Sequence, residues 1–166
     1  AWGVQTASHG AKRVICIDTS ESALEYVAEN AQRNGVSDRV FTVQGNATEV
    51  LAGLKADGEN ADVVVLDPPA FIKRKKDFRN GFRGYQKLNE RGISLVKPDG
   101  IIATCSCSHH MPAKDFLTMV NRAAVHVDRQ LQILAEMGQS RDHPIHPAMP
   151  ETRYLKTTFA RVLPRN

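Results

Sequence analysis

Short apolar runs alternate with amphipathic stretches along the chain. Residues 13–18 (RVICID) form an apolar run that ends in an acid and predicts a buried strand. Residues 22–34 repeat apolar side chains at helical spacing and end in Asn-Gly, which indicates an amphipathic helix. The same reasoning predicts strands at 40–44, 61–66, 101–104, 132–136 and 154–162, and helices at 47–56, 83–96 and 113–127. This alternation favours a mostly parallel α/β sheet with helices on both faces.

Composition is that of an ordinary soluble domain. The 166 residues are 42% hydrophobic and 24% charged, and we expect residues 1–166 to form one domain. No apolar run approaches the roughly 20 residues of a membrane span, and the first residues do not resemble a signal peptide. The three cysteines are too few for a disulfide framework, which favours reduced thiols and a cytoplasmic location: Cys16, Cys105 and Cys107.

Basic and aromatic residues gather in one short stretch. The net charge is +4, and six Lys or Arg side chains fall between residues 73 and 83. The aromatic residues of this region are Phe71, Phe78, Phe82 and Tyr85. Because Lys and Arg neutralise phosphates and aromatic rings stack on unpaired bases, the stretch predicts an RNA contact. A solvated surface loop is the alternative interpretation.

Polar residues follow the predicted strands, where ligands bind in open α/β sheets. Asp18 follows the first strand and has the position of a ribose-binding carboxylate, although it also suits a helix cap or a turn. Asn46 follows the second strand and is suited either to an adenine edge or to a local turn. Asp67-Pro68-Pro69 follows the third strand. Its fixed backbone carbonyls and carboxylate are suited to the N3 and N4 edge of cytosine, with a plain turn as the alternative.

In order along the chain, these motifs resemble the catalytic domain of the bacterial large-subunit ribosomal RNA cytosine-C5 methyltransferase family. The resemblance covers essentially all of the chain and rests on Asp18 with TSESALEYVAENAQRNG, GNATEVL, DPPAF, GYQKLNERGISLVKPDGIIATCSCSHHM and DHP. That family joins an RNA-binding PUA domain to a Rossmann-like domain that binds S-adenosylmethionine (SAM). The resemblance therefore implies a class I SAM methyltransferase fold, SAM as cofactor and ribosomal RNA as substrate.

The resemblance also assigns roles to residues. It implies that Cys107 is the nucleophile and that Asp67 faces both the cofactor and the target base. The residues expected to bind SAM are Gly3, Asp18, Thr19, Asn46, Ala47, Asp67 and Pro68. The residues expected to contact the substrate are Pro69, Phe71, Lys73, Arg74, Lys76 and Arg83.

A cysteine suits cytosine chemistry because addition of a thiolate at C6 makes C5 nucleophilic toward a methyl donor. The thiolate requires a nearby cation, and His109, His110 and the arginines are the candidates. Cys105 lies two residues before Cys107, so in a strand both thiols point the same way, and Cys105 is the reserve candidate for nucleophile or helper. For Cys107, the alternative is a small buried residue at a strand end.

Other functions fit the sequence less well. Ala70 replaces the aromatic residue that amino-methylating enzymes place after two prolines, which argues against chemistry on an exocyclic nitrogen. The spacing of the C-x-C-x-H-H segment is tighter than in zinc knuckles, so no metal is expected. No G-x-G-x-x-G precedes Asp18, which argues against a dinucleotide dehydrogenase. Methylation of another RNA atom or of a small molecule, and a non-catalytic RNA-binding module, remain alternatives.

The family carries a glycine-containing strand upstream of the point where this chain begins, and we expect that first strand and the PUA domain to be missing here. Counted as the first, the missing strand would lie between those ending at Asp18 and Asp67, in the order 3-2-1-4-5-7-6. Omission of about five buried apolar residues forfeits on the order of 10 kcal/mol. We therefore expect this chain alone to be unstable, inactive, or associated as a homodimer or by strand swapping.

Overall fold

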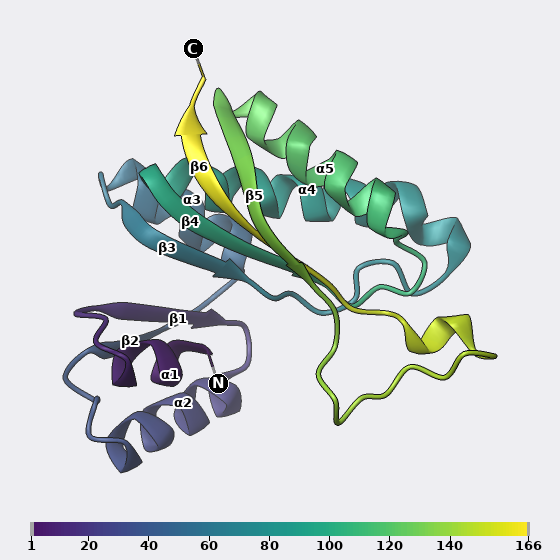
Figure 1. The fold of residues 1–166 in the computed structure, drawn as a ribbon. Helices are drawn as coiled ribbons and strands as arrows, with labels where there is room; N and C mark the ends of the chain where they lie inside the picture. The colour runs from purple at the N-terminus through teal and green to yellow at the C-terminus, as the bar shows by residue number, and fades with distance from the viewer. Residues whose placement is uncertain (1, 166) are drawn as a thin grey trace. The chain divides into compact units, whose positions relative to one another are not determined.

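The chain divides into two units at residues 53 and 54 (Figure 1), and each unit contains its own hydrophobic cluster. The structure is a computed structural model that describes residues 2–165. Its elements are α1 (Trp2–Ser8), β1 (Val14–Asp18), α2 (Glu21–Arg33), β2 (Val40–Gln44), α3 (Ala47–Ala56), β3 (Ala61–Leu66), η1 (Lys75–Asp77), α4 (Phe78–Leu95), β4 (Val96–Ser106), α5 (Ala113–His126), β5 (Arg129–Met137), η2 (Pro150–Thr152) and β6 (Lys156–Pro164).

The first unit is built on the parallel pair β1–β2, which runs in register from Val14 opposite Val40 to Asp18 opposite Gln44. Helices α1 and α2 share one hydrophobic cluster with these strands, formed by Val4, Ala7, Ala31, Val36 and Val40. A Cβ on Gly3 would meet the Cys16 sulfur, so this glycine lets α1 pack directly on β1. The Ser20 hydroxyl accepts a hydrogen bond from the Ala23 backbone N–H and caps α2.

The second unit is a sheet in the order β3-β4-β6-β5. Strands β3 and β4 are parallel, whereas β6 runs antiparallel to both β4 and β5. Helices α4 and α5 pack against each other and on one face of this sheet (Figure 1). Their shared cluster is formed by Ile72, Tyr85, Met111, Phe116, Met119 and Val120. Strand β4 lies between β3 and β6 and is buried from Ile102 through Ser106, so the polar segment that follows it starts from the interior of the sheet.

The predicted strand order is confirmed within each unit. With the missing strand counted first, the order contains β2 beside β1 and then β3-β4-β6-β5, and these are the observed pairings. In the described part of the chain, β1 pairs with β2 alone and β3 pairs with β4 alone. The position of a further strand between β1 and β3 stays a prediction.

The bounds of two predicted elements were wrong. Helix α4 begins at Phe78 rather than near residue 83, because Phe78 and Phe82 lie one turn apart and pack together on the cluster at 5.9 Å between ring centroids. Strand β4 begins at Val96 rather than near residue 101, so residues 97–100 lie within the strand, where the register against β3 shifts. Strand β3, by contrast, has the predicted bounds, and Val63 in this edge strand is 52% exposed.

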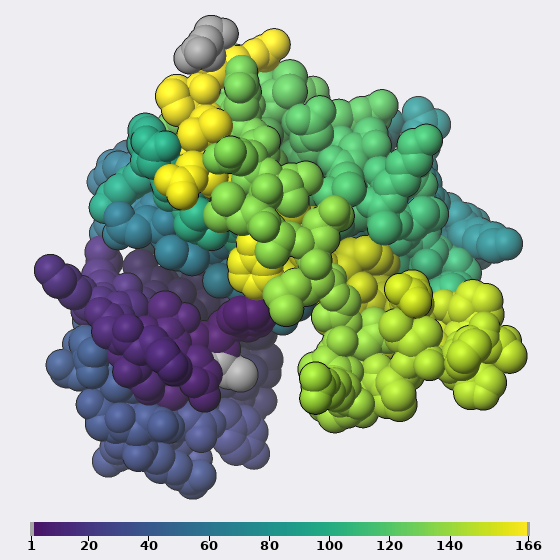
Figure 2. Space-filling model, in the orientation of Figure 1, coloured from purple at the N-terminus to yellow at the C-terminus, as the bar shows by residue number. Residues whose placement is uncertain are grey.

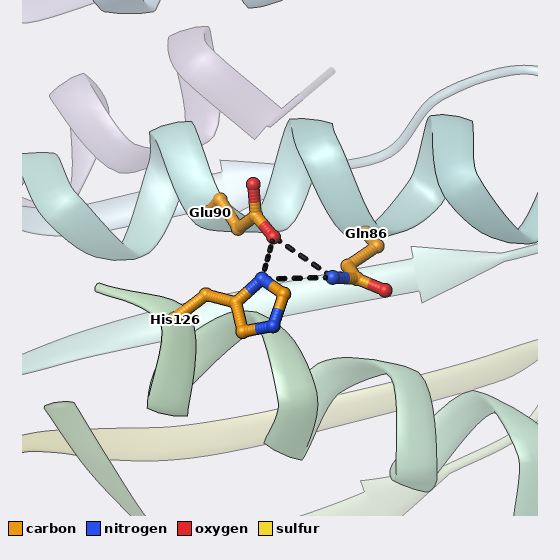
Figure 3. A network of polar contacts seen from close by, with 3 residues as sticks. All are labelled: Gln86, Glu90 and His126. Carbon is orange, nitrogen blue, oxygen red and sulfur yellow. Dashed lines mark hydrogen bonds and ion pairs between the residues drawn. The ribbon is translucent and has the colours of Figure 1, made fainter. Parts of the chain in front are cut away.

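A polar contact ties α4 to α5 at the surface (Figure 3). The imidazole Nδ1 of His126 lies 2.9 Å from Glu90 Oε1, and the Gln86 amide nitrogen lies 2.9 Å from the same oxygen and 3.1 Å from the imidazole. Figure 3 shows the three side chains converging from two turns of α4 and the end of α5. Because the His126 side chain is 60% exposed, this contact supplements the hydrophobic packing of the two helices rather than replacing it.

Residues 138–155 extend away from the sheet of the second unit, as the yellow-green segment of Figures 1 and 2 shows. The segment is exposed along most of its length and includes exposed Ile145 and Met149. It ends where β6 begins, so it leads directly into the strand that pairs with β4. None of the helices in residues 2–165 combines the length and the apolar character that crossing a membrane requires.

Candidate active site

The loop after β3 is fixed by two buried hydroxyl groups. The Tyr85 hydroxyl, from α4, lies 2.9 Å from the Ser108 hydroxyl, which follows β4. The Phe71 backbone N–H donates to Tyr85 at 3.3 Å, and the Ile72 backbone N–H donates to Ser108 at 3.1 Å. Tyr85 and Ser108 are almost completely buried. The segment that begins at Asp67 is therefore held against both α4 and the end of β4.

The Cys107 thiol lies at this same loop. Strand β4 ends at Ser106, so Cys107 follows the strand directly and is half-buried. Its Sγ donates to the Pro68 carbonyl oxygen at 3.9 Å. Two motifs that are 39 positions apart in the sequence thus meet at one end of the sheet. Exposed Asp67 and Pro69 flank the proline that accepts this contact.

Cys105 has a different environment from Cys107. It is the penultimate residue of β4, only 3% exposed, and its sulfur accepts a hydrogen bond from the Thr157 hydroxyl at 3.4 Å. Burial raises the pKa of the Cys105 thiol, and the charges of Asp67 and Cys107 raise it further against the opposing effect of Thr157. Cys105 is consequently held as a neutral thiol.

Lys156 is a site residue that the sequence reasoning missed. It is the first residue of β6 and pairs with Ser106. Its Nζ donates to the Ser108 carbonyl at 2.6 Å and to the Tyr154 carbonyl at 2.7 Å. Burial lowers the pKa of Lys156 to about 8, opposed by the charge of Cys107. The only signal in the sequence was a single lysine at the start of a predicted closing strand.

The two histidines after Cys107 contact each other. The rings of His109 and His110 meet edge to face, with 5.1 Å between centroids. They stay candidates, together with the arginines, for the cation beside the thiol, and Lys156 of β6 is a further candidate because the charge of Cys107 raises its pKa against the effect of burial. Within the part of the chain that is described, no three or more His, Cys, Asp or Glu side chains have an arrangement that could hold a metal ion.

The predicted cofactor-binding residues of the first unit lie at the carboxyl ends of β1 and β2. Asp18 Oδ1 accepts from the Ser20 backbone N–H at 2.8 Å, and Asn46 Oδ1 accepts from the Thr48 backbone N–H at 2.9 Å. Both local turns that were the alternative interpretations are therefore present. The Gly45 backbone N–H donates to the Asp18 carbonyl at 2.9 Å, which brings Asp18 and Asn46 to the same end of the strand pair.

The other predicted cofactor-binding residues lie in both units of the chain. Thr19 follows Asp18 and its carbonyl accepts from the Gln44 side chain at 3.3 Å. Ala47 is the first residue of α3, and Gly3 lies within α1 against β1. These residues belong to the first unit, whereas Asp67 and Pro68 belong to the second. A single cofactor site formed by both groups stays a prediction.

The basic stretch is exposed, but its aromatic residues are engaged in packing. Lys73, Arg74, Lys76 and Arg83 are exposed, and Arg74 forms an ion pair with Asp77 at 3.0 Å. Base stacking by Tyr85 was a wrong prediction, because its ring is fully buried. The Phe71 ring packs 4.6 Å from that of Tyr85, and Phe78 and Phe82 pack partly buried on the same cluster.

Curated proteins named as ribosomal RNA large subunit methyltransferases match this chain along almost its whole length. The chain is 36% identical to ribosomal RNA large subunit methyltransferase I of Aeromonas salmonicida over 162 residues, which are 96% of this chain and 41% of that protein. The chain thus spans about two fifths of the length of the curated relatives it matches.

Solved structures share the fold at low sequence identity. The structure of SMU.776 complexed with SAH has a TM-score of 0.82 at 17% identity and covers 95% of this chain and 41% of that one. The O-methyltransferase from Bacillus cereus in complex with SAH has a TM-score of 0.57 at 16% identity and covers 90% of this chain and 62% of that one. The fold is therefore the Rossmann-like methyltransferase fold, as predicted. Because the family model described as Conserved hypothetical protein 95 matches residues 1–123, this chain belongs to that family.

Proposed function

We propose that the chain is part of a SAM-dependent methyltransferase that modifies cytosine C5 in ribosomal RNA, with Cys107 as the nucleophile. The observation that carries the proposal is the position of the Cys107 thiol at the Pro68 carbonyl, beside a loop suited to a cytosine edge. The names of the curated relatives support ribosomal RNA as the substrate class.

The residues at the strand ends fit the cofactor. The Asp18 side chain is exposed and uses one oxygen in its local turn, which leaves the other for a ribose hydroxyl. The Asn46 side chain is exposed and uses its oxygen locally, which leaves its amide nitrogen for adenine. When bound, SAM would supply an electrophilic methyl group. The proposal keeps residues 1–166 as one methyltransferase domain and keeps Asp67 and Pro68 among the cofactor-binding residues.

Cys107 is better suited to the nucleophilic role than Cys105. The thiolate is the attacking species, and burial disfavours it at Cys105 by raising the pKa of that thiol. In the proposed reaction, the Cys107 sulfur bonds to C6 of cytosine and thereby makes C5 nucleophilic. After C5 accepts the methyl group, a base takes the proton from C5, the electron pair of that C–H bond restores the double bond between C5 and C6, and the sulfur leaves C6 as a thiolate. Asp67 and the carbonyls of the two prolines would hold the N3 and N4 edge of the base during these steps.

The exposed basic side chains near this loop would hold the RNA backbone. Lys73, Arg74 and Lys76 follow the DPPAF segment within a few residues, and each phosphate contact adds salt dependence to binding. Replacement of these three residues by Glu is expected to weaken RNA binding and to reduce the dependence of the affinity on salt. If the dependence of RNA affinity on salt concentration did not change, the basic stretch would not be part of the RNA interface.

Nucleoside analysis tests the proposed reaction. Ribosomal RNA is incubated with labelled SAM and the full-length protein in wild-type, Cys107→Ser and Cys105→Ser forms. We expect label in 5-methylcytidine with the wild type and with Cys105→Ser, and none with Cys107→Ser. Label in another nucleoside would keep the methyltransferase and reject the thiolate mechanism, and label that persists in Cys107→Ser would reject Cys107 as the nucleophile.

A further inference from the structure

Helix α4 carries a row of basic side chains on its outer face. Lys or Arg recurs at every fourth position, and each of these side chains is exposed: Arg79, Arg83, Lys87 and Arg91. At this spacing the side chains lie on one side of the helix, about 6 Å apart along its axis and over about 18 Å in all. Tyr85, which falls between Arg83 and Lys87, is fully buried and binds the loop after β3. The basic row of α4 therefore lies on the helix face opposite the one that holds this loop.

The positive charges of the row have no counter-charge on the protein. In residues 2–165, none of these side chains forms an ion pair with a carboxylate. Glu90, the only acidic residue of α4, instead lies 2.9 Å from His126 Nδ1 and 2.9 Å from the Gln86 amide nitrogen (Figure 3). Because like charges four residues apart weaken a helix, an external anion bound along the row would relieve their repulsion.

The row borders a hollow of about 470 Å³ in the surface. Its lining comes from α4 and from the end of α5: Arg83, Gln86, Lys87, Glu90, Arg91 and His126. Every lining side chain is polar or charged, whereas small-molecule pockets and the centres of protein interfaces are lined mainly by apolar and aromatic side chains. Phosphate oxygens accept from guanidinium, ammonium and amide groups. The hollow is therefore suited to a phosphate backbone rather than to an apolar ligand or a protein surface.

The row continues the basic stretch that follows the active-site loop. That stretch, at residues 73–76, lies just before α4, which begins at Phe78. The first turns of α4 are fixed to the loop, because a Cβ at Gly81 would lie 2.8 Å from the Phe71 carbonyl oxygen. An RNA strand that presents one base to the loop has flanking backbone that must lie over the neighbouring surface. Helix α4 offers unpaired positive charge next to that loop as far as Arg91.

We propose that the outer face of α4 binds the sugar-phosphate backbone of the RNA that flanks the target nucleotide. The basic row contacts phosphates, so this binding is independent of base sequence. The surface contributes to the affinity for RNA and takes no part in methyl transfer, because it lies on the helix face away from the active-site loop. The inference rests on the proposed function for the choice of ribosomal RNA as the ligand. It adds Arg79, Lys87 and Arg91 to the residues expected to contact that RNA.

The affinity of the full-length protein for RNA across a range of salt concentrations tests this surface. The ligand is large-subunit ribosomal RNA transcribed without modification and titrated in a filter-binding assay. Lys87→Gln combined with Arg91→Gln removes two charges from the row and none from the loop after β3. Lys55→Gln combined with Lys97→Gln is the matched control. Both of these lysines are exposed and bind side chains around the start of β3, at the opposite end of that strand from the active-site loop.

We expect the Lys87→Gln/Arg91→Gln variant to bind RNA about tenfold more weakly at about 0.1 M salt. The slope of log affinity against log salt concentration should become shallower by about 1.4–1.8, because two phosphate contacts are lost. The control should match the wild type in both measurements. Lys87→Arg combined with Arg91→Lys keeps the charges and should keep the affinity. If the Lys87→Gln/Arg91→Gln variant does not fold, Lys87→Gln alone carries the same test with half the change in slope.

Several results would overturn the inference. Wild-type affinity and slope in the Lys87→Gln/Arg91→Gln variant would do so, and so would an equal loss in the control, which would report net charge alone. Weaker binding with an unchanged slope would also overturn it, because phosphate contacts release ions. Unchanged binding to protein-free RNA, together with weaker binding to the intact ribosomal subunit, would assign the surface to a protein partner instead.

The outcome is separable from that of the proposed function. The salt dependence reports RNA binding alone, whereas nucleoside analysis reports the methylated atom and the need for Cys107. Cytosine methylation that requires Cys107, together with unchanged RNA binding by the Lys87→Gln/Arg91→Gln variant, would keep the proposed function and reject this surface. A shallower slope without methylation of cytosine would reject the proposed reaction and keep the surface. At saturating RNA the variant should methylate at the wild-type rate, and a slower rate there would contradict a role in binding alone.

Discussion

The polar residues at the strand ends of the two units are held in different ways. In the second unit, Tyr85, Ser108 and Lys156 join α4, the loop after β3, the end of β4 and the start of β6. In the first unit, the side chains of Asp18 and Asn46 bind backbone groups two residues further along the chain. The difference indicates that the end of β4 near Cys107 is held more rigidly than the strand ends of the first unit. The carboxylate and amide of the first unit have only their local turns to maintain and remain accessible to a ligand.

The largest effect is expected where α4 meets the loop after β3. A Cβ at Gly81 would lie 2.8 Å from the Phe71 carbonyl oxygen and would also clash with Ile72, so Gly81→Ala must displace the loop. We expect it to lower the free energy of unfolding by about 3 kcal/mol and to abolish methylation. Urea unfolding of the full-length protein measures the first effect, and the labelled-SAM assay measures the second.

Gly53→Ala in α3 is the matched control for that substitution. No atom lies within 4 Å of a Cβ at Gly53, so the substitution should instead raise the free energy of unfolding by about 0.5–1 kcal/mol through helix propensity. Equal effects at the two glycines would contradict the close packing that we attribute to α4 and the loop.

The next effect tests the buried hydroxyl of Ser108. Ser108→Ala leaves the buried Ile72 N–H without its acceptor, which should lower the free energy of unfolding by about 1–3 kcal/mol. Methyl transfer should fall with it, because the loop loses its link to the end of β4. Ser94→Ala is the control, since its hydroxyl is exposed and binds only the Arg91 carbonyl within the same helix. An equal loss of unfolding free energy in the two variants would contradict the role of the Ser108 hydrogen bonds in holding the loop.

In the first unit, Asp18→Asn separates folding from ligand binding. Asparagine retains the oxygen that accepts from Ser20, so the free energy of unfolding should change by less than about 0.5 kcal/mol. The affinity for SAM, measured by calorimetry on the full-length protein, should fall about tenfold, because the charge that favours the ribose hydroxyls is lost. A variant that binds SAM as the wild type does would reduce Asp18 to a turn residue.

The smallest effect is the pH dependence that Lys156 adds to stability. Its pKa is lowered from 10.5 to about 8, so between these values the unfolded state binds more protons than the folded state. The contribution of Lys156 to stability therefore rises with pH through this window, and its burial penalty is fully present below about pH 8.

Partial exposure should keep this gain below about 1 kcal/mol. Urea unfolding at about pH 7.5 and about pH 9.5 measures it as the difference between the wild type and Lys156→Gln. A difference that is constant across this range would contradict the shifted pKa.

Features that depend on short stretches of sequence were predictable. The β-branched run before Asp67 gave the correct bounds of β3, and the position of Cys107 after a strand was correct. The local turns of Asp18 and Asn46 were among the stated alternatives, since their partners lie two residues away. Such contacts require no knowledge of tertiary structure.

Features that depend on distant pairing were not predictable. Lys156 reaches the Ser108 carbonyl over 48 positions of sequence, and only the register of β4 with β6 brings them together. The aromatic residues that were predicted to stack on RNA bases instead pack on the hydrophobic cluster shared by α4 and α5. The same packing explains why α4 begins at Phe78, before its predicted first residue. The exposure of Val63 follows from the strand neighbours of β3, which its own apolar sequence does not specify.

The central claim is that Cys107 forms a covalent bond to cytosine, and the most direct test traps that bond. A fluorine at C5 cannot leave as the proton does, so RNA containing 5-fluorocytidine should remain attached to the sulfur after methyl transfer. With labelled RNA, SAM and the full-length protein, denaturing electrophoresis should show a covalent complex for the wild type and for Cys105→Ser, and none for Cys107→Ser. A complex that forms without Cys107, or methylation of cytosine by the Cys107→Ser variant, would contradict the account.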